Sequence, residues 1–214
     1  MLRAGYLSVK PSDESPQPAI PAIVLAAGGS IRMGRSKARL PIQPDGTFLG
    51  RILRTLAEAG LDPLIAVTRE RLDIPSLWHD TRSARVIEVI NPEPARGQLS
   101  SLLCGLDAIA QPPQAVLMTL VDVPLPAAAT VRALVASWHR TRVPLVRPLH
   151  AGRHGHPVIF GEALLTALRA ANPADGAKPI VRTFASRGID VAVDDPGVLR
   201  DVDTPEDYLQ ILDA

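Results

Sequence analysis

Two kinds of segment alternate along most of this chain, and their alternation limits its possible folds more than any other feature. The first kind is short, mostly apolar and bounded by proline, glycine or polar residues, which is typical of buried strands. These expected strands cover 22–27, 63–68, 84–90, 115–121, 143–149, 156–160 and 189–193. The second kind carries apolar residues at helical spacing. These expected helices cover 48–60, 99–110, 129–140, 162–171 and 179–188, with a last helix expected from 204. Such alternation predicts an α/β fold with a mostly parallel sheet.

The ends of the chain differ in character from its middle. Residues 1–19 include the polar, proline-rich stretch PSDESPQP, so we interpret them as a disordered tail and place one folded domain at 20–214. Near the other end, Thr204 can cap a helix that starts at Pro205, and Asp207 completes a pattern like a capping box. The loop HAGRHG, at 150–155, is expected to join two strands as a small hairpin.

Composition excludes several classes of function. The formal net charge is +1 and aromatic residues make up 3% of the chain, so neither a basic field nor base-stacking platforms are available for nucleic acid. The single cysteine, Cys104, excludes an internal disulfide and a cysteine-based zinc site. No apolar run approaches the roughly 20 residues that span a bilayer, and the N-terminus lacks the apolar core of a signal peptide. We therefore expect a cytoplasmic protein without nucleic-acid or membrane partners.

The loop after the first expected strand is rich in glycine and in basic residues. In parallel α/β sheets, ligands bind beyond the carboxyl ends of the strands, where this loop lies. Its glycines let the backbone turn tightly and approach a ligand, and its cations suit a polyphosphate. The residues concerned are Gly28, Gly29, Gly34, Arg32, Arg35 and Lys37. We treat Lys37 as a surface residue, whose replacement by alanine should hardly change stability.

Known phosphate-binding motifs do not account for this loop. A Walker A motif needs Gly-Lys-Ser or Gly-Lys-Thr after a four-residue gap, and the dinucleotide fingerprint needs glycines at positions that Ser30 and Met33 occupy. A solvated basic loop without a ligand is therefore the alternative interpretation from composition alone.

Aspartates follow the expected strands at two places. Asp122 comes directly after the most apolar run, so its carboxylate should lie at the carboxyl end of the sheet and could bind Mg²⁺. Asp201 and Asp203 are two residues apart in an extended stretch, so they should point the same way, and either could join Asp122. A loop-capping role for Asp122 and helix-dipole complementarity for Asp203 are the alternatives, although Glu206 and Asp207 already supply such complementarity.

Two further segments contain candidate ligand-binding residues. Ser100 and Ser101 begin a helix after Gly97, where free backbone N–H groups could bind an anion or a base edge, or where the serines could simply cap the helix. Arg153 and His156 lie in the glycine-rich turn between two strands. That turn could equally be a plain surface hairpin, and no third ligand is near enough in sequence for a metal site.

The exact strings along the chain resemble one family. The first loop, LAAG-x-S-x-RMG-x-x-K, is similar to the signature of the molybdenum cofactor cytidylyltransferases and their relatives among the nucleotidyltransferases. Further matching segments follow in order over residues 20–212. They are NPEPARGQLSSLLCGL at 91–106, VDVP at 121–124, GRHGHPVIF at 152–160, GAKP at 176–179 and DVDTPEDY at 201–208. Two features depart from the pattern: Lys178 stands where arginine is usual, and the segment 42–53 is slightly long.

The resemblance implies a three-layer, Rossmann-like nucleotidyltransferase fold with a small hairpin insertion. It implies transfer of CMP from CTP to the molybdopterin-bound molybdenum cofactor, with release of pyrophosphate and Mg²⁺ as cofactor. Lys37, Arg32 and Asp122 would be catalytic, and Asp122 and Asp203 would bind the metal. The acceptor would contact Ser100, Arg153 and His156. The nucleotide would contact Leu25, Ala26, Ala27, Gly28, Gly29, Ser30, Gly34, Lys37 and Ser101.

Three alternatives to this activity remain. The enzyme could use GTP, it could act on another phosphorylated small molecule, or the chain could be a non-catalytic chaperone that delivers the cofactor to a molybdoenzyme. Catalysis is favoured over a chaperone because a pure binding protein has no reason to keep a metal-binding carboxylate at Asp122. A molybdoenzyme or its chaperone is the expected protein partner.

Overall fold

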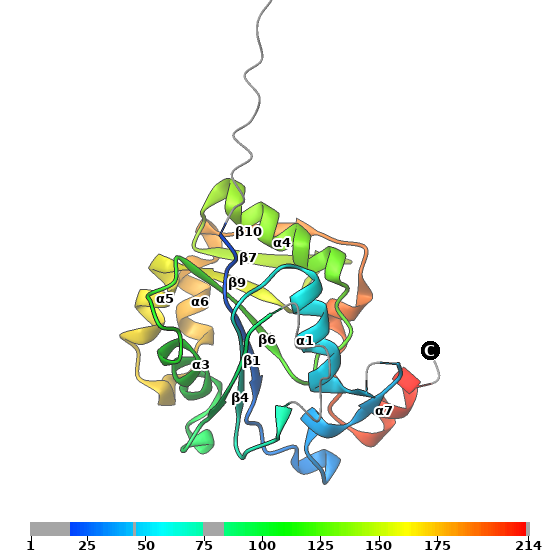
Figure 1. The fold of residues 1–214 in the computed structure, drawn as a ribbon. Coiled ribbons are helices and arrows are strands. Elements are labelled where there is room, and N and C mark those ends of the chain that lie inside the picture. Colours follow the sequence, from blue (N-terminus) through cyan, green and yellow to red (C-terminus); the bar gives the residue numbers. More distant parts are fainter. Residues whose placement is uncertain (1–17, 45, 75–83, 213–214) are drawn as a thin grey trace, which may run out of the picture.

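The computed structural model describes residues 18–44, 46–74 and 84–212, and within them eight strands form one twisted sheet (Figure 1). Its order is β10-β7-β9-β6-β1-β4-β5, and β8 pairs with β7. The strands are β1 (Ala22–Ala26), β4 (Leu64–Thr68), β5 (Val86–Ile90), β6 (Ala115–Leu120), β7 (Leu145–His150), β8 (Arg153–His154), β9 (Val158–Gly161) and β10 (Ile189–Ala192). All pairings are parallel except those of β8 and β9, so the predicted, mostly parallel sheet is confirmed.

Helices cover both faces of this sheet, which gives the predicted three layers (Figure 1). α1 and α4 lie on one face, and α3, α5 and α6 lie on the other. The α-helices are α1 (Phe48–Glu58), α3 (Gln98–Asp107), α4 (Ala128–Thr141), α5 (Glu162–Arg169), α6 (Lys178–Phe184) and α7 (Pro205–Leu212). Short 3₁₀ turns are η1 (Ile31–Met33), η2 (Lys37–Arg39), η3 (Pro94–Arg96), η4 (Pro173–Asp175), η5 (Ala185–Arg187) and η6 (Pro196–Leu199). In the described ranges, no helix combines the length and the apolarity that crossing a membrane requires.

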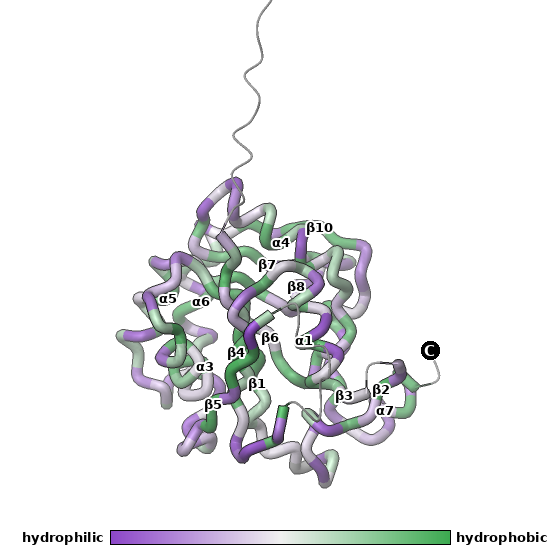
Figure 2. The backbone as a smooth tube through the Cα atoms, in the orientation of Figure 1, coloured by the Kyte–Doolittle hydropathy of each residue, from purple (hydrophilic) through white to green (hydrophobic). Residues whose placement is uncertain are grey.

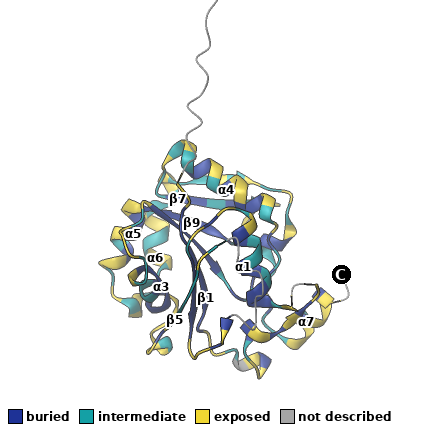
Figure 3. Cartoon of the chain, viewed as in Figure 1, coloured by how far each residue is buried: buried dark blue, intermediate teal, exposed yellow. Residues whose placement is uncertain are grey.

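Alternate side chains of the central strand enter two separate cores. In β1, Val24 packs with α1 and α4 on one face, whereas Ile23 and Leu25 pack with α3 on the other. This division follows from the strand geometry, in which successive side chains point to opposite faces. Figure 2 shows the resulting apolar centre, and Figure 3 shows that the central strands are buried while the outer helix surfaces are exposed. The carboxyl end of β1 is therefore held firmly between two helical layers.

Three structural details differ from the sequence expectations or extend them. A two-stranded antiparallel ribbon, β2 (Pro41–Ile42) with β3 (Gly46–Thr47), lies in the slightly long segment before α1 and was not predicted. The hairpin that was predicted around 150–155 is confirmed, because β7 and β9 pair antiparallel on either side of that loop, and the two-residue strand β8 adds a second pairing at the end of β7. The predicted tail lies outside the described residues except for Pro18 and Ala19, which are exposed beside the buried Ile20.

Candidate active site

A cavity of about 200 Å³ opens at the carboxyl ends of β1 and β6 and at the start of α3. Its lining comes from the glycine-rich loop, from the turn before α3 and from the end of β6. These residues are Leu25, Ala27, Gly28, Ser30, Lys37, Pro94, Gly97, Gln98, Ser101, Leu120, Val121 and Asp122. A second hollow, of about 230 Å³, shares two of them and is lined by Gly29, Ser30, Arg32, Lys37 and Asp203. The two hollows adjoin at Ser30 and Lys37, and the second contains the charged side chains of Arg32 and Asp203.

The glycine-rich loop folds back on itself and brings Lys37 into the site. Ser30 adopts a left-handed conformation with φ 47°, and its carbonyl accepts hydrogen bonds from Met33 and Gly34. Its hydroxyl accepts from the backbone N–H of Lys37 over 3.3 Å. Gly34 has φ 64°, a conformation that glycine adopts without steric cost. The loop therefore turns twice within a few residues and ends with Lys37 at the start of η2.

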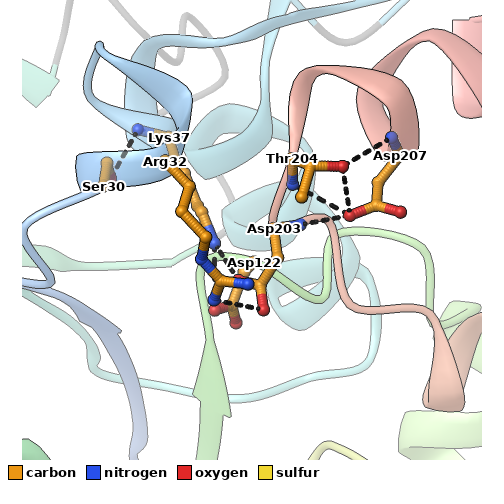
Figure 4. A network of polar contacts seen from close by, with 7 residues as sticks. All are labelled: Ser30, Arg32, Lys37, Asp122, Asp203, Thr204 and Asp207. Atoms are coloured by element: carbon orange, nitrogen blue, oxygen red, sulfur yellow. Dashed lines mark hydrogen bonds and ion pairs between the residues drawn. The ribbon is translucent and has the colours of Figure 1, made fainter.

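Lys37 lies between two carboxylates that come from distant parts of the chain (Figure 4). Its Nζ is 3.4 Å from Asp122 Oδ2 and 2.5 Å from Asp203 Oδ1. The second carboxylate oxygen of Asp203 pairs with Arg32 Nη2 at 2.8 Å. The structure thus brings together four predicted site residues whose chain positions are up to 171 residues apart. The prediction that Lys37 is a surface residue is wrong, because this residue is only 7% exposed.

The pKa values of two aspartates in and beside this cluster are shifted in opposite directions. The hydrogen bond from Lys37 holds the pKa of Asp203 below its ordinary value, with Arg32 contributing in the same direction. Burial raises the pKa of Asp201, and the charges of Asp122 and Asp203 add to that rise. Asp203 is therefore favoured as a charged member of the cluster, and Asp201 is less suited to that role.

The aspartates fit a divalent cation in the chemistry of their donor atoms. Asp122 Oδ1 is buried and has no hydrogen-bond partner, although Lys37 contacts the other oxygen. Mg²⁺ prefers oxygen ligands and is usually held by one or two carboxylates together with substrate phosphates and water. Among the described residues, no group of three or more His, Cys, Asp or Glu side chains could hold a metal by itself. A cation here would therefore depend on ligands from the substrate in addition to Asp122 and Asp203.

The segment that carries Asp203 is fixed at both sides. The backbone N–H of Val202 donates to the carbonyl of Asp122 over 2.8 Å, which joins the two aspartate segments directly. At the start of α7, the carboxylate of Asp207 accepts from the backbone N–H groups of Asp203 and Thr204, and the Thr204 hydroxyl accepts from Asp207 N (Figure 4). The predicted capping box is thus confirmed, and it also orients the backbone of Asp203.

The start of α3 presents Ser101 to the cavity and keeps Ser100 away from it. Ser101 lines the cavity and is 5% exposed. The Ser100 hydroxyl donates to the carbonyl of Gly97 over 2.8 Å, which leaves its predicted contact with the acceptor as a prediction. Asn91 binds both hydroxyls and is 1% exposed. Sequence reasoning missed Asn91, although its place directly after a strand and before a proline was a usable signal.

The turn with the remaining acceptor candidates packs against η6. His156 donates its backbone N–H to the carbonyl of Val198 over 2.9 Å, and a Cβ at Gly155 would collide with that same carbonyl. Burial lowers the pKa of the His156 imidazole, and the charge of Asp122 opposes that shift. Arg153 is exposed on β8. The charge interaction places His156 near Asp122. Of the predicted site residues, Ala26, Gly34, Ser100, Arg153 and His156 line neither hollow.

Comparisons with known proteins agree with this architecture. The family described as the MobA-like NTP transferase domain matches residues 22–189. A molybdenum cofactor cytidylyltransferase of Escherichia coli is 25% identical over 193 residues, which are 89% of this chain and 94% of that protein. The crystal structure of Rv0371c from Mycobacterium tuberculosis is 28% identical, with a TM-score of 0.72 over 92% of this chain and 98% of that one. Its complex with manganese is 25% identical, with a TM-score of 0.70 over 92% of this chain and 100% of that one.

Proposed function

This chain belongs to the MobA-like NTP transferase family and is a nucleotidyltransferase, and on that premise we propose that it transfers CMP from CTP to the terminal phosphate of a molybdopterin-type cofactor, releasing pyrophosphate. The observation that carries the proposal is the cluster of Lys37, Asp122 and Asp203 beside the cavity at the carboxyl ends of β1 and β6. The cytidylyltransferase from Escherichia coli supports the choice of substrates, because the likeness extends over nearly the whole of both chains.

The proposed division of labour follows the two ends of the site. The base and ribose of CTP would occupy the cavity between the glycine-rich loop and α3, and the triphosphate would extend toward Lys37 and Arg32. Lys37 would neutralise the charge that builds between the α- and β-phosphates, and Arg32 would bind the pyrophosphate end. Alignment of the acceptor phosphate with the α-phosphorus would then supply much of the rate.

A divalent cation completes this proposal. Asp122 and Asp203 would hold Mg²⁺, which supplies charge neutralisation at the phosphates when it is bound. The manganese complex of the protein from Mycobacterium tuberculosis supports a divalent cation in this fold, and Mg²⁺ is our choice among such ions. Lys37 would exchange part of its contact with Asp122 and Asp203 for contact with the phosphates.

The base preference is proposed from the first turn of the site. Ala27 lines the cavity and is 4% exposed, so its methyl group narrows the space beside Leu25. A smaller pyrimidine suits this space better than guanine, and the guanylyl relatives tend, by resemblance, to carry glycine at this position. The second candidate is an enzyme that uses GTP as the donor, or one that uses another phosphorylated small molecule as the acceptor. On the other side of Asp122, Arg153 and His156 would bind the acceptor together with Ser100.

The deciding experiment measures pyrophosphate release from each of the four NTPs, with Mg²⁺ and molybdenum cofactor. We expect release from CTP that depends on the cofactor, and binding of CTP without turnover in its absence. For variants that remove a carboxylate of the cluster, the matched control is Glu206→Gln. It removes one carboxylate from the exposed start of α7 and should retain full activity. Release from GTP alone would replace the proposed base, and CTP binding without any release would favour the chaperone alternative.

A further inference from the structure

One buried amide controls both serines at the start of α3. Asn91 Nδ2 donates to Ser100 Oγ over 3.0 Å and to Ser101 Oγ over 2.9 Å. Asn91 Oδ1 accepts from the backbone N–H of Glu93 over 2.9 Å. A backbone N–H can only donate, so this third bond decides which end of the amide is oxygen and which is nitrogen. Both serine hydroxyls therefore act as acceptors toward Asn91.

The protons of the two hydroxyls consequently have different destinations. Ser100 donates its proton to the carbonyl of Gly97 over 2.8 Å. That carbonyl belongs to the N-cap of α3 and also accepts the first backbone bond of the helix, so it has no capacity left for Ser101. Over the ranges 18–44, 46–74 and 84–212, no acceptor receives the proton of Ser101. Because Ser101 lines the cavity, that proton is available there for a ligand.

We propose that Asn91 is a positioning residue that fixes the Ser101 hydroxyl as a hydrogen-bond donor toward the nucleobase. The inference rests on the proposed function and adds a physical basis for choosing between the two pyrimidines. Both pyrimidines present an acceptor at O2, but N3 is an acceptor in cytosine and carries a proton in uracil, so we place the Ser101 hydroxyl against N3. Accepting that proton would leave the buried Ser101 proton without an acceptor, which is costly. The relay from Asn91 to Ser101 therefore selects CTP over UTP.

The critical variant is Asn91→Asp, which keeps the size of the side chain and its bond from the Glu93 N–H. A carboxylate can only accept, so the Ser101 proton should turn toward it and a lone pair should face the cavity. We expect the ratio of kcat/KM for CTP to that for UTP to fall about 10- to 100-fold. The ratio is informative because a loss of folded protein, or added negative charge, affects both triphosphates equally. A purely structural role of Asn91 would leave this ratio unchanged.

A double-mutant cycle tests whether the effect passes through Ser101. Ser101→Ala by itself should lower the CTP-to-UTP ratio, because the donor is lost. In the Ser101→Ala background, Asn91→Asp should change the ratio by less than about twofold, since the hydroxyl that it reorients is gone. An undiminished effect of Asn91→Asp in that background would overturn the relay. If Asn91→Asp does not fold, the CTP-to-UTP ratio is compared between Ser100→Ala and Ser101→Ala. Only Ser101→Ala should change the ratio, and an unchanged ratio in that variant would overturn the proposal.

The outcomes separate this inference from the proposed function. A wild-type enzyme that prefers CTP to UTP, with the same preference in Asn91→Asp, would overturn the relay and leave cytidylyl transfer intact. A wild-type enzyme that releases pyrophosphate only from GTP would overturn both. Calorimetric binding of CTP and of UTP, each with Mg²⁺, gives the ratio of their dissociation constants, which should change in the same direction and does not depend on the acceptor.

Discussion

Replacement of Lys37 by alanine tests the charged cluster most directly, because this one side chain contacts both aspartates. We expect kcat/KM with CTP to fall by roughly 10²- to 10⁴-fold, which is the range for removal of a preorganised electrostatic group. The exposed Arg140→Ala on α4 removes the same charge far from the site and serves as the control. Near-normal turnover in Lys37→Ala would refute the assignment of this lysine to the phosphates.

The same substitution should also affect stability. Breaking a fully buried ion pair costs about 3–5 kcal/mol, and exposed pairs contribute about 0–1 kcal/mol. The side chains of Asp122 and Asp203 are 27% and 35% exposed, so we expect a loss of about 1–2 kcal/mol. In a domain of this size, that loss lowers Tm by roughly 2–8 °C. A Tm equal to that of the wild type would show that solvent compensates the two carboxylates fully.

The pH dependence of stability provides a second test of the Lys37→Ala variant. Lys37 holds the pKa of Asp203 below its ordinary value, so this carboxylate stabilises the fold above the unfolded-state pKa of about 4 and loses that contribution as pH falls through the folded pKa. The Tm difference between the wild type and Lys37→Ala should therefore be larger at pH 7 than near pH 3. A difference that stays constant over this range would contradict the pairing with Asp203.

Three further predictions concern other parts of the site. Asp122→Asn should abolish turnover, and Asp203→Asn should reduce it strongly. The double variant should be no worse than the worse single variant, because the two residues act as one unit. Additive losses, or full activity in EDTA, would show that they share no metal. CTP should be preferred to GTP by at least about 10-fold in kcat/KM, and equal turnover of both would remove the role of Ala27. Gly155→Ala should destabilise the fold by about 1–3 kcal/mol, because its Cβ would collide with the Val198 carbonyl, and an unchanged Tm in differential scanning calorimetry would show that this packing is loose.

Periodicity in the sequence was sufficient for the main elements of the fold. The run at 115–121 and the helical spacing at 48–60 correspond to β6 and α1 within one or two residues at each end. The two-residue strands β2, β3 and β8 escaped prediction because two residues show no period, and only their pairing partners define them. The antiparallel pairing of β9 with β7 followed from the predicted hairpin, whereas the pairing of β9 with β6 was not predicted.

The site was predictable in its residues but not in their contacts. The glycine-rich loop and Asp122 follow apolar strands, so their place at the carboxyl end of the sheet could be anticipated. The burial of Lys37 could not be anticipated, because lysine is usually exposed and its carboxylate partners, Asp122 and Asp203, lie 85 and 166 residues further along the chain. Asn91 was missed because its importance depends on hydrogen bonds to residues nine and ten positions later, across an irregular turn.

The position of Asp203 in the chain has a consequence for biosynthesis. Lys37 precedes it by 166 residues, and every strand of the sheet is synthesised between or before them. During translation at about 5–20 residues per second, the glycine-rich loop leaves the ribosome roughly 8–33 s before the carboxylate that pairs with Lys37. A nascent chain can thus assemble most of its sheet while Lys37 still lacks Asp203 as a partner. Emergence of the DVDTPEDY segment supplies the second carboxylate, so a chain that stops short of it would lack this part of the proposed metal site.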